Sequence, residues 1–172
     1  VLELGGSVGH FFYSIQNFCT VPEKLKWIIA ELPEAVKLGR EIAKERMENR
    51  LSFLDSNEIA LTDPADIFLT AGTLQYMSEN LSDILKTLKA QPKHVLVHNL
   101  PVHSKKAFWT HQNLGLCEVP YRVYAKPELI SSMNKIGYHL VAEWLKPREI
   151  EIPFNRSLVI DGYLGFYFSK ND

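Results

Sequence analysis

The sequence predicts an α/β fold in which a doubly wound, mostly parallel sheet is covered by helices on both faces. Short apolar runs recur along the chain, and stretches with helical features separate most of them. This alternation is typical of βαβ units. The last two apolar runs have only a polar stretch, 146–162, between them. We therefore expect seven strands, of which the last is antiparallel and pairs with its predecessor.

The first half of the chain supplies four of the expected strands and two of the helices. The strands are expected at 1–4, 26–31, 51–54 and 66–71. Gly5-Gly6 ends the first of them. Residues 11–19 are apolar enough for a packed helix. Pro33 is expected to open a second helix that runs to about Met47, because proline fits the first turn of a helix.

The second half continues the alternation. Leu81, Ile84, Leu85 and Leu88 are spaced i, i+3, i+4, i+7, which predicts one apolar helical stripe. Another helix is expected from Lys126 to a stop at Gly137. The remaining strands are expected at 94–98, 138–145 and 163–168. The longest irregular stretch is 99–124, and a loop of that length is usually functional or a lid.

Length and composition indicate one globular domain, residues 1–172, with 46% hydrophobic and 23% charged residues. A formal charge of -1 does not favour nucleic acid or anionic lipid as partner. No apolar stretch reaches the roughly 18 residues of a membrane span. We expect a cytoplasmic protein that does not bind membranes. Because the chain opens directly on an apolar run at Val1, we also expect that an N-terminal part of the domain is missing.

Cys19 and Cys117 are the only cysteines. Two thiols cannot build a disulfide framework or a four-thiolate zinc site. We expect both to be small buried hydrophobic residues. Asp63 and Asp66 precede the fourth expected strand, at the end away from a binding edge, so no metal site is predicted.

A glycine-rich turn, Gly5-Gly6-Ser7-Val8-Gly9, follows the first expected strand. Glycine allows a tight turn, and the next helix offers free N–H groups; a plain strand-to-helix turn is the alternative. The turn lacks the Gly spacing of i, i+2, i+5 for dinucleotides and the Gly-Lys-Ser/Thr of a P-loop. It does fit the pattern acid-x-Gly-x-small-x-Gly, with Glu3 as the acid.

This pattern resembles the first motif of class I S-adenosylmethionine-dependent methyltransferases, with Ser7 where many members have Gly. The resemblance covers nearly the whole chain, including the reversed last strand. The stretches 1–9, 71–76, 100–101 and 110–112 resemble an uncharacterised bacterial family of methyltransferase-like proteins. The resemblance implies a Rossmann-like fold, S-adenosylmethionine as cofactor and an enzyme that transfers a methyl group.

Candidate cofactor ligands lie at the carboxyl ends of the expected strands. Glu31 ends the second strand, where a carboxylate can accept hydrogen bonds from both ribose hydroxyls; a solvated acid at a strand end is the alternative. Asp55 resembles the family's adenine-contacting acid, or belongs to a turn. The full set of cofactor-binding candidates is Glu3, Gly5, Gly6, Ser7, Gly9, Glu31, Asp55 and Gly72.

In the resembled family, the segment after the fourth strand lies beside the methyl acceptor. Enzymes that methylate amino groups of nucleic acids carry Asp/Asn-Pro-Pro-aromatic there, whereas this chain has Leu74-Gln75-Tyr76. That stretch looks more like the segment at the fourth strand of small-molecule O-methyltransferases. We expect O-methylation of a small molecule or glycan precursor and no nucleic-acid partner. The substrate-binding candidates are Gln75, Tyr76, Thr110 and Gln112, and Trp109 or Tyr121 could cover a ring.

A hydroxyl acceptor needs a base, and histidine suits that role near neutral pH. His10 and His98 lie near the binding edge, but His103 and His111 are the catalytic candidates because they lie on or beside the long 99–124 stretch. A structural role is the alternative for each. Two other functions stay open: a non-catalytic S-adenosylmethionine- or nucleotide-binding protein with this fold, and a Rossmann-type NAD(P)-dependent enzyme.

Overall fold

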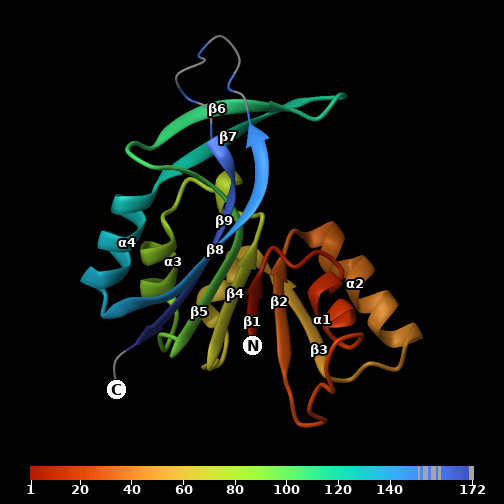
Figure 1. The fold of residues 1–172 in the computed structure, drawn as a ribbon. Coiled ribbons are helices and arrows are strands. Elements are labelled where there is room, and N and C mark those ends of the chain that lie inside the picture. Colours follow the sequence, from red (N-terminus) through yellow and green to blue (C-terminus); the bar gives the residue numbers. More distant parts are fainter. Residues whose placement is uncertain (151, 153–154, 156–157, 159, 171–172) are drawn as a thin grey trace.

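The computed structural model describes all residues except 151, 153–154, 156–157, 159 and 171–172 (Figure 1). Five parallel strands form the first part of the sheet, in the order β3-β2-β1-β4-β5. Their bounds are β1 Leu2–Leu4, β2 Trp27–Glu31, β3 Leu51–Asp55, β4 Ile67–Ala71 and β5 His94–His103. Strand β1 is central, and all three of its residues are buried, including the acid Glu3.

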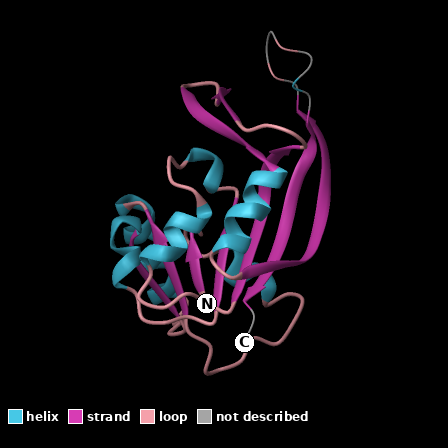
Figure 2. Cartoon of the chain, turned by 90° about the vertical axis from the view of Figure 1, so that its left-hand side faces the viewer, coloured by secondary structure: helices cyan, strands magenta, loops and turns pink. Residues whose placement is uncertain are grey.

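Helices cover both faces of the sheet (Figures 1 and 2). On one side lie α1 (His10–Ile15) and α2 (Pro33–Glu45), which contribute Phe12 and Val36 to one core cluster. On the other side lie α3 (Leu81–Thr87) and α4 (Lys126–Lys135), which contribute Leu85 and Met133 to a larger cluster. Two short 3₁₀ turns, η1 (Ser56–Leu61) and η2 (Leu74–Tyr76), follow β3 and β4. The doubly wound arrangement is thus confirmed.

The predicted reversed strand is confirmed. Strand β9 (Ile160–Lys170) runs antiparallel to both β5 and β8 (Tyr138–Ile150) and lies between them. Both strands are longer than the sequence predicted. Much of the expected polar loop 146–162 is therefore strand, and its middle falls largely outside the described residues. The paired ladder explains the difference, because it satisfies backbone groups that a free loop would leave to water.

Two predictions are wrong: the irregular stretch at 99–124, and the count of seven strands, since the described part of the chain has nine. Strand β5 continues to His103, and an antiparallel hairpin follows, made of β6 (Phe108–Asn113) and β7 (Glu118–Ala125). In β6, half-buried residues alternate with exposed ones, which is the period of two of a strand with one covered face. Polar residues occupy both faces of β6, so its apolar pattern does not reveal this period. The hairpin projects beyond the carboxyl ends of the parallel strands (Figure 1).

The two cysteines are a second correction, because both are exposed free thiols. Helix α1 ends at Ile15 rather than near Cys19, so Cys19 lies outside the packed segment. Cys117 lies in the turn between β6 and β7. Within the described part of the chain, no helix has the length and apolar character needed to cross a membrane.

Candidate functional site

The glycine turn follows β1 and is packed too closely for side chains at its first two positions. A Cβ at Gly5 would lie 1.9 Å from Thr73 Oγ1, and the φ of Gly5 is +75°. A Cβ at Gly6 would lie 2.5 Å from the carboxyl carbon of Glu3. The turn is therefore packed between Thr73, which follows β4, and the side chain of Glu3 from β1.

The Glu3 side chain supports the turn from β1. It is 1% exposed, and its Oε2 accepts a 2.7 Å hydrogen bond from the indole Nε1 of Trp27. Burial, and to a smaller extent the nearby Glu31, raise the pKa of Glu3 to about 7, although the Trp27 hydrogen bond lowers it. The carboxyl group lies beneath the turn, so Glu3 fixes the position of Gly6 from inside the protein.

Glu31, at the end of β2, faces the turn from the neighbouring strand. Its Oε1 accepts a 3.1 Å hydrogen bond from the backbone N–H of Ser7, and its Oε2 accepts one of 2.6 Å from Leu32. Ser7 has a φ of +53°. A carboxylate oxygen can accept two hydrogen bonds, so each oxygen of Glu31 keeps capacity for one more. Two hydroxyl groups on adjacent carbons match that pair of acceptors.

Asp55 ends β3 in register with Glu31 of β2. Its side chain accepts a 2.9 Å hydrogen bond from Asn57 N and caps η1. The structure thus shows the turn that was one of the two interpretations of Asp55, and places the residue at the same sheet edge as the Glu31 carboxylate. Gly9 lies buried at the start of α1 with a φ of +101°.

The segment after β4 places polar atoms at this edge. Gly72 N donates a 2.9 Å hydrogen bond to the carbonyl of His98, which joins the end of β4 to the middle of β5. A Cβ at Gly72 would lie 3.7 Å from Gln75 Nε2 and 3.8 Å from Asn99 Cβ. Gln75 is 4% exposed, and its Oε1 has no hydrogen-bond partner among the described residues. A buried amide oxygen without a partner is costly and points to a bound group or water.

A tyrosine cluster, defined as Tyr76, Tyr121 and Tyr163, lies between η2 and the hairpin. Tyr76 Oη donates a 2.6 Å hydrogen bond to Gln112 Oε1, and Tyr121 Oη donates one of 3.3 Å to Tyr163 Oη. The rings of Tyr76 and Tyr121 meet edge to face, with centroids 5.6 Å apart. Burial raises the pKa of both Tyr76 and Tyr121. The phenols therefore stay protonated near neutral pH and act as hydrogen-bonding groups.

The structure brings the substrate-binding candidates together. Gln75 and Tyr76 belong to η2, and Gln112 reaches Tyr76 from β6. Thr110 pairs with Tyr121 in the hairpin and lies on the same half-buried face of β6 as Gln112. Trp109 lies on the opposite face of that strand and is 52% exposed.

The two catalytic candidates are separated from this group. His111 is exposed on the face of β6 opposite Thr110 and Gln112. His103 ends β5, and its Nδ1 accepts hydrogen bonds from the backbone N–H groups of Lys105 and Lys106, at 3.1 and 3.2 Å. Its basic nitrogen is thus engaged by the backbone.

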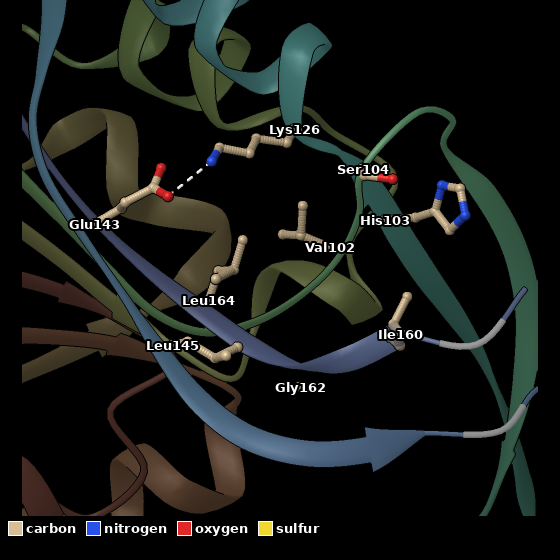
Figure 3. Close-up of a pocket in the computed structure, with 9 residues that line it drawn as sticks. All are labelled: Val102, His103, Ser104, Lys126, Glu143, Leu145, Ile160, Gly162 and Leu164. Carbon is tan, nitrogen blue, oxygen red and sulfur yellow. Dashed lines mark hydrogen bonds and ion pairs between the residues drawn. The ribbon is translucent and has the colours of Figure 1, made fainter.

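His103 also lines a cavity of about 260 Å³ on the α4 side of the sheet. Figure 3 shows His103 and Ser104 at one end of this cavity and the ion pair of Lys126 and Glu143 at the other. The ion pair joins Nζ to Oε1 at 2.7 Å. Val102 lies between them, and Leu145 and Leu164 line the cavity below the ion pair.

His98, by contrast, lies at the sheet edge beside Gly72. Its Nδ1 accepts a 3.0 Å hydrogen bond from Trp144 Nε1, and the two rings stack with centroids 5.9 Å apart. Burial and the positive charge of Lys146 lower the pKa of His98. No spacing in the sequence links His98 to Trp144, since β9 lies between their strands. Gly165 of β9 is the one signal: a Cβ there would lie 2.0 Å from the Trp144 ring.

Comparison with known proteins finds similar three-dimensional structures but no similar sequences. No family model matches the sequence, and no curated protein is similar to it. Solved structures share the fold over 99% of this chain, and three of them serve as examples. The glycopeptide N-methyltransferase MtfA, complexed with sinefungin, has a TM-score of 0.64 and 11% identity, with 80% of that chain covered.

The CcbJ methyltransferase from Streptomyces caelestis has a TM-score of 0.62 and 15% identity, with 83% of that chain covered. Magnesium protoporphyrin IX methyltransferase (ChlM) from Synechocystis PCC 6803, with bound SAH, has a TM-score of 0.65 and 12% identity, with 73% covered. Each match covers nearly all of this chain, and so takes in its parallel strands, its reversed strand β9 and the helices on both faces. The chain therefore has the Rossmann-like fold of the class I S-adenosylmethionine-dependent methyltransferases.

Proposed function

We propose that this protein is an S-adenosylmethionine-dependent methyltransferase that methylates an oxygen atom of a small molecule or glycan precursor. The observation that carries the proposal is the Glu31 carboxylate, which accepts the N–H of Ser7 in the glycine turn and keeps a free acceptor site on each oxygen. A ribose offers two neighbouring hydroxyl groups to such a pair. The similar structures named above are methyltransferases, and two of them hold sinefungin or SAH, which supports the same cofactor.

The residues at the sheet edge fit this cofactor in three parts. The turn from Gly5 to Gly9 would receive the methionine end, because Gly5 and Gly6 leave its first two positions without side chains, so that a ligand can approach the backbone there. Glu31 would hold the ribose, and Asp55, in register with it, would face the adenine. When bound, S-adenosylmethionine supplies a methyl group on a positively charged sulfur, which an acceptor atom can displace.

The chain's own residues supply positioning. Alignment of the acceptor with the methyl group gives much of the rate of such a displacement. Gln75, Tyr76 and Gln112 offer neutral hydrogen-bonding groups between η2 and the hairpin, next to the end of β4. The unpartnered Oε1 of Gln75 accepts hydrogen bonds, and we expect an N–H or O–H of the bound cofactor or substrate to satisfy it.

Isothermal titration calorimetry with S-adenosylmethionine and S-adenosylhomocysteine tests the cofactor part. We expect binding to the full chain, with at least a tenfold loss in Glu31→Ala and in Gly5→Val. Glu34→Ala is the matched control, because Glu34 is an exposed acid in the first turn of α2. Absence of binding by the unaltered chain would refute the proposal.

The methyl-transfer step is tested by measuring the release of S-adenosylhomocysteine after mixtures of candidate methyl acceptors are added. Oxygen-methylated products, identified by mass spectrometry, are expected. Binding of the cofactor without turnover on any pool would instead assign the chain to the non-catalytic binding proteins with this fold. Products methylated only on nitrogen would contradict the choice of oxygen.

A further inference from the structure

Strand β5 is interrupted where it reaches the candidate site. Its pairing with β9 shifts register between Val97 and Leu100, and Asn99 has a φ of +53°. A non-glycine residue in the left-handed region costs free energy, and such residues cluster at functional sites. The carbonyl of His98 accepts the Gly72 N–H, so the irregular pair His98-Asn99 is level with the end of β4.

Two side chains of β8 hold this irregular pair. Trp144 Nε1 donates to His98 Nδ1 at 3.0 Å, and Lys146 Nζ donates to Asn99 Oδ1 at 3.3 Å. Trp144 reaches across β9 because Gly165 has no side chain there. Packing thus fixes His98 and keeps the Lys146 ammonium group beside it.

The Trp144 hydrogen bond decides which form of His98 is present. An indole N–H can only donate, so the ring nitrogen that it meets must be unprotonated. A neutral imidazole then carries its proton on Nε2, which leaves His98 with a donor and no free basic nitrogen. On the neighbouring elements, α1 presents the Phe11 ring to His98 and β8 presents Trp144 and Lys146. An N–H donor next to a cation recognises an anion.

His98 also ends an apolar groove of about 530 Å³. The groove lies on the α1 side of the sheet and is lined by α1, β4 and β5. Its apolar lining includes Phe11, Ile15, Leu69 and Leu96. A ligand that matches both parts has an apolar body in the groove and an anionic group at His98 and Lys146.

We propose that His98 and Lys146 bind the ionised carboxylate of an apolar carboxylic acid, which is the methyl acceptor. This inference rests on the proposed function. One carboxylate oxygen accepts from His98 Nε2–H and from Lys146. A lone pair of the other oxygen forms the bond to the methyl carbon while the methyl–sulfur bond breaks, and that electron pair stays on sulfur. The products are a methyl ester and S-adenosylhomocysteine. No proton is removed, so the step needs no general base.

Binding of defined probes tests the acceptor class. Octanoate and phenylacetate are titrated into the full chain with and without S-adenosylhomocysteine, beside octanamide and phenylacetamide. We expect the carboxylates to bind at least tenfold more tightly than their amides. His98→Ala and Lys146→Ala should each remove most of this preference, and Lys146→Arg should retain it. His139→Ala is the matched control, because His139 is an exposed histidine of the same strand β8.

Nitrogen-15 NMR of the histidine rings tests the geometry without turnover. At pH 7.5, His98 should show an unprotonated Nδ1 and a protonated Nε2, and Trp144→Phe should abolish this fixed tautomer. A protonated Nδ1 in the unaltered chain overturns the inference, as does equal binding of amides and carboxylates or no carboxylate binding. Any of these results alongside S-adenosylhomocysteine binding leaves the proposed function standing. Absence of S-adenosylhomocysteine binding refutes the proposed function and, with it, the role of the acid as methyl acceptor. An intact carboxylate preference and tautomer would then still support the anion site at His98 and Lys146.

Discussion

The indole nitrogen of Trp27 and the carboxylate of Glu3 form a buried hydrogen bond of 2.7 Å that joins β2 to β1 directly beneath the glycine turn. Trp27 begins β2 and Glu3 lies in the middle of β1, so the bond connects the two strands whose ends carry the candidate cofactor ligands. An ionisable group buried at this point makes the turn's support sensitive to pH.

Glu3→Gln is predicted to remove part of the pH dependence of stability. The pKa of Glu3 in the folded chain, about 7, lies above its ordinary value of 4.5. The folded state therefore binds more protons than the unfolded state between these values, and stability falls as pH rises through that interval. Glutamine keeps the acceptor for Trp27 but cannot ionise. At pH 8 the variant should be more stable by about 3 kcal/mol, since one pKa unit corresponds to about 1.4 kcal/mol.

Urea denaturation at pH 5, 6, 7 and 8 measures this effect. Glu45→Gln, at an exposed acid near the end of α2, is the control and should leave the pH profile unchanged. An unchanged profile in Glu3→Gln, or a variant destabilised equally at all pH values, would contradict the role of buried charge.

Gly5→Ala is predicted to destabilise the fold by about 1–3 kcal/mol and to weaken cofactor binding. The added Cβ would lie 1.9 Å from Thr73 Oγ1, at a φ of +75°. Gly115→Ala is a matched control, because Gly115 has a φ of +88° with nothing within 4 Å of a Cβ. Both variants place a side chain at a positive φ, but only Gly5→Ala brings a Cβ against Thr73. Thermal unfolding and calorimetry with S-adenosylhomocysteine therefore separate the backbone strain from the steric clash with Thr73. Equal behaviour of the two variants would rule out the collision.

Tyr76→Phe is predicted to loosen the β6–β7 hairpin. The change removes the 2.6 Å hydrogen bond to Gln112, and a typical bond of this kind contributes about 0.5–1.5 kcal/mol. Amide hydrogen exchange of residues 108–113 should become faster. Tyr167→Phe removes a 2.9 Å bond to His94 elsewhere in the sheet and should leave exchange in the hairpin unchanged. Unaltered exchange in Tyr76→Phe would show that the hairpin is held by other contacts.

Gly165→Val is predicted to displace Trp144 and release His98. A Cβ at Gly165 would lie 2.0 Å from the indole, and valine is otherwise well suited to a strand. Stability should fall by about 1–3 kcal/mol, and the Trp144 fluorescence should shift. The double variant Gly165→Val/Trp144→Ala should recover stability relative to Gly165→Val, because the collision is gone. Failure to recover would place the cost in the backbone of β9.

The regular parts of the fold follow from local patterns. Apolar runs of strand length, Pro33 at a helix start and the 81–88 stripe each report on neighbours along the chain, and the structure has a strand or helix at each. The β6–β7 hairpin could not be predicted from the local pattern, because β6 carries polar residues on both faces and its strand character depends on pairing with β7. The prediction that Cys19 and Cys117 are buried was wrong, because composition does not show where a helix ends or a turn lies.

The candidate site divides in the same way. Gly5, Glu31 and Asp55 lie at strand ends, and parallel strands bring their carboxyl ends to one edge, so the sequence alone determined that these residues would be neighbours. Only the tertiary structure decided which histidine lies at that edge. His98 is fixed by Trp144, which is distant in sequence and reaches it across β9. A contact between non-adjacent strands depends on sheet order and on a missing side chain at Gly165, and neither leaves a periodic pattern in the sequence.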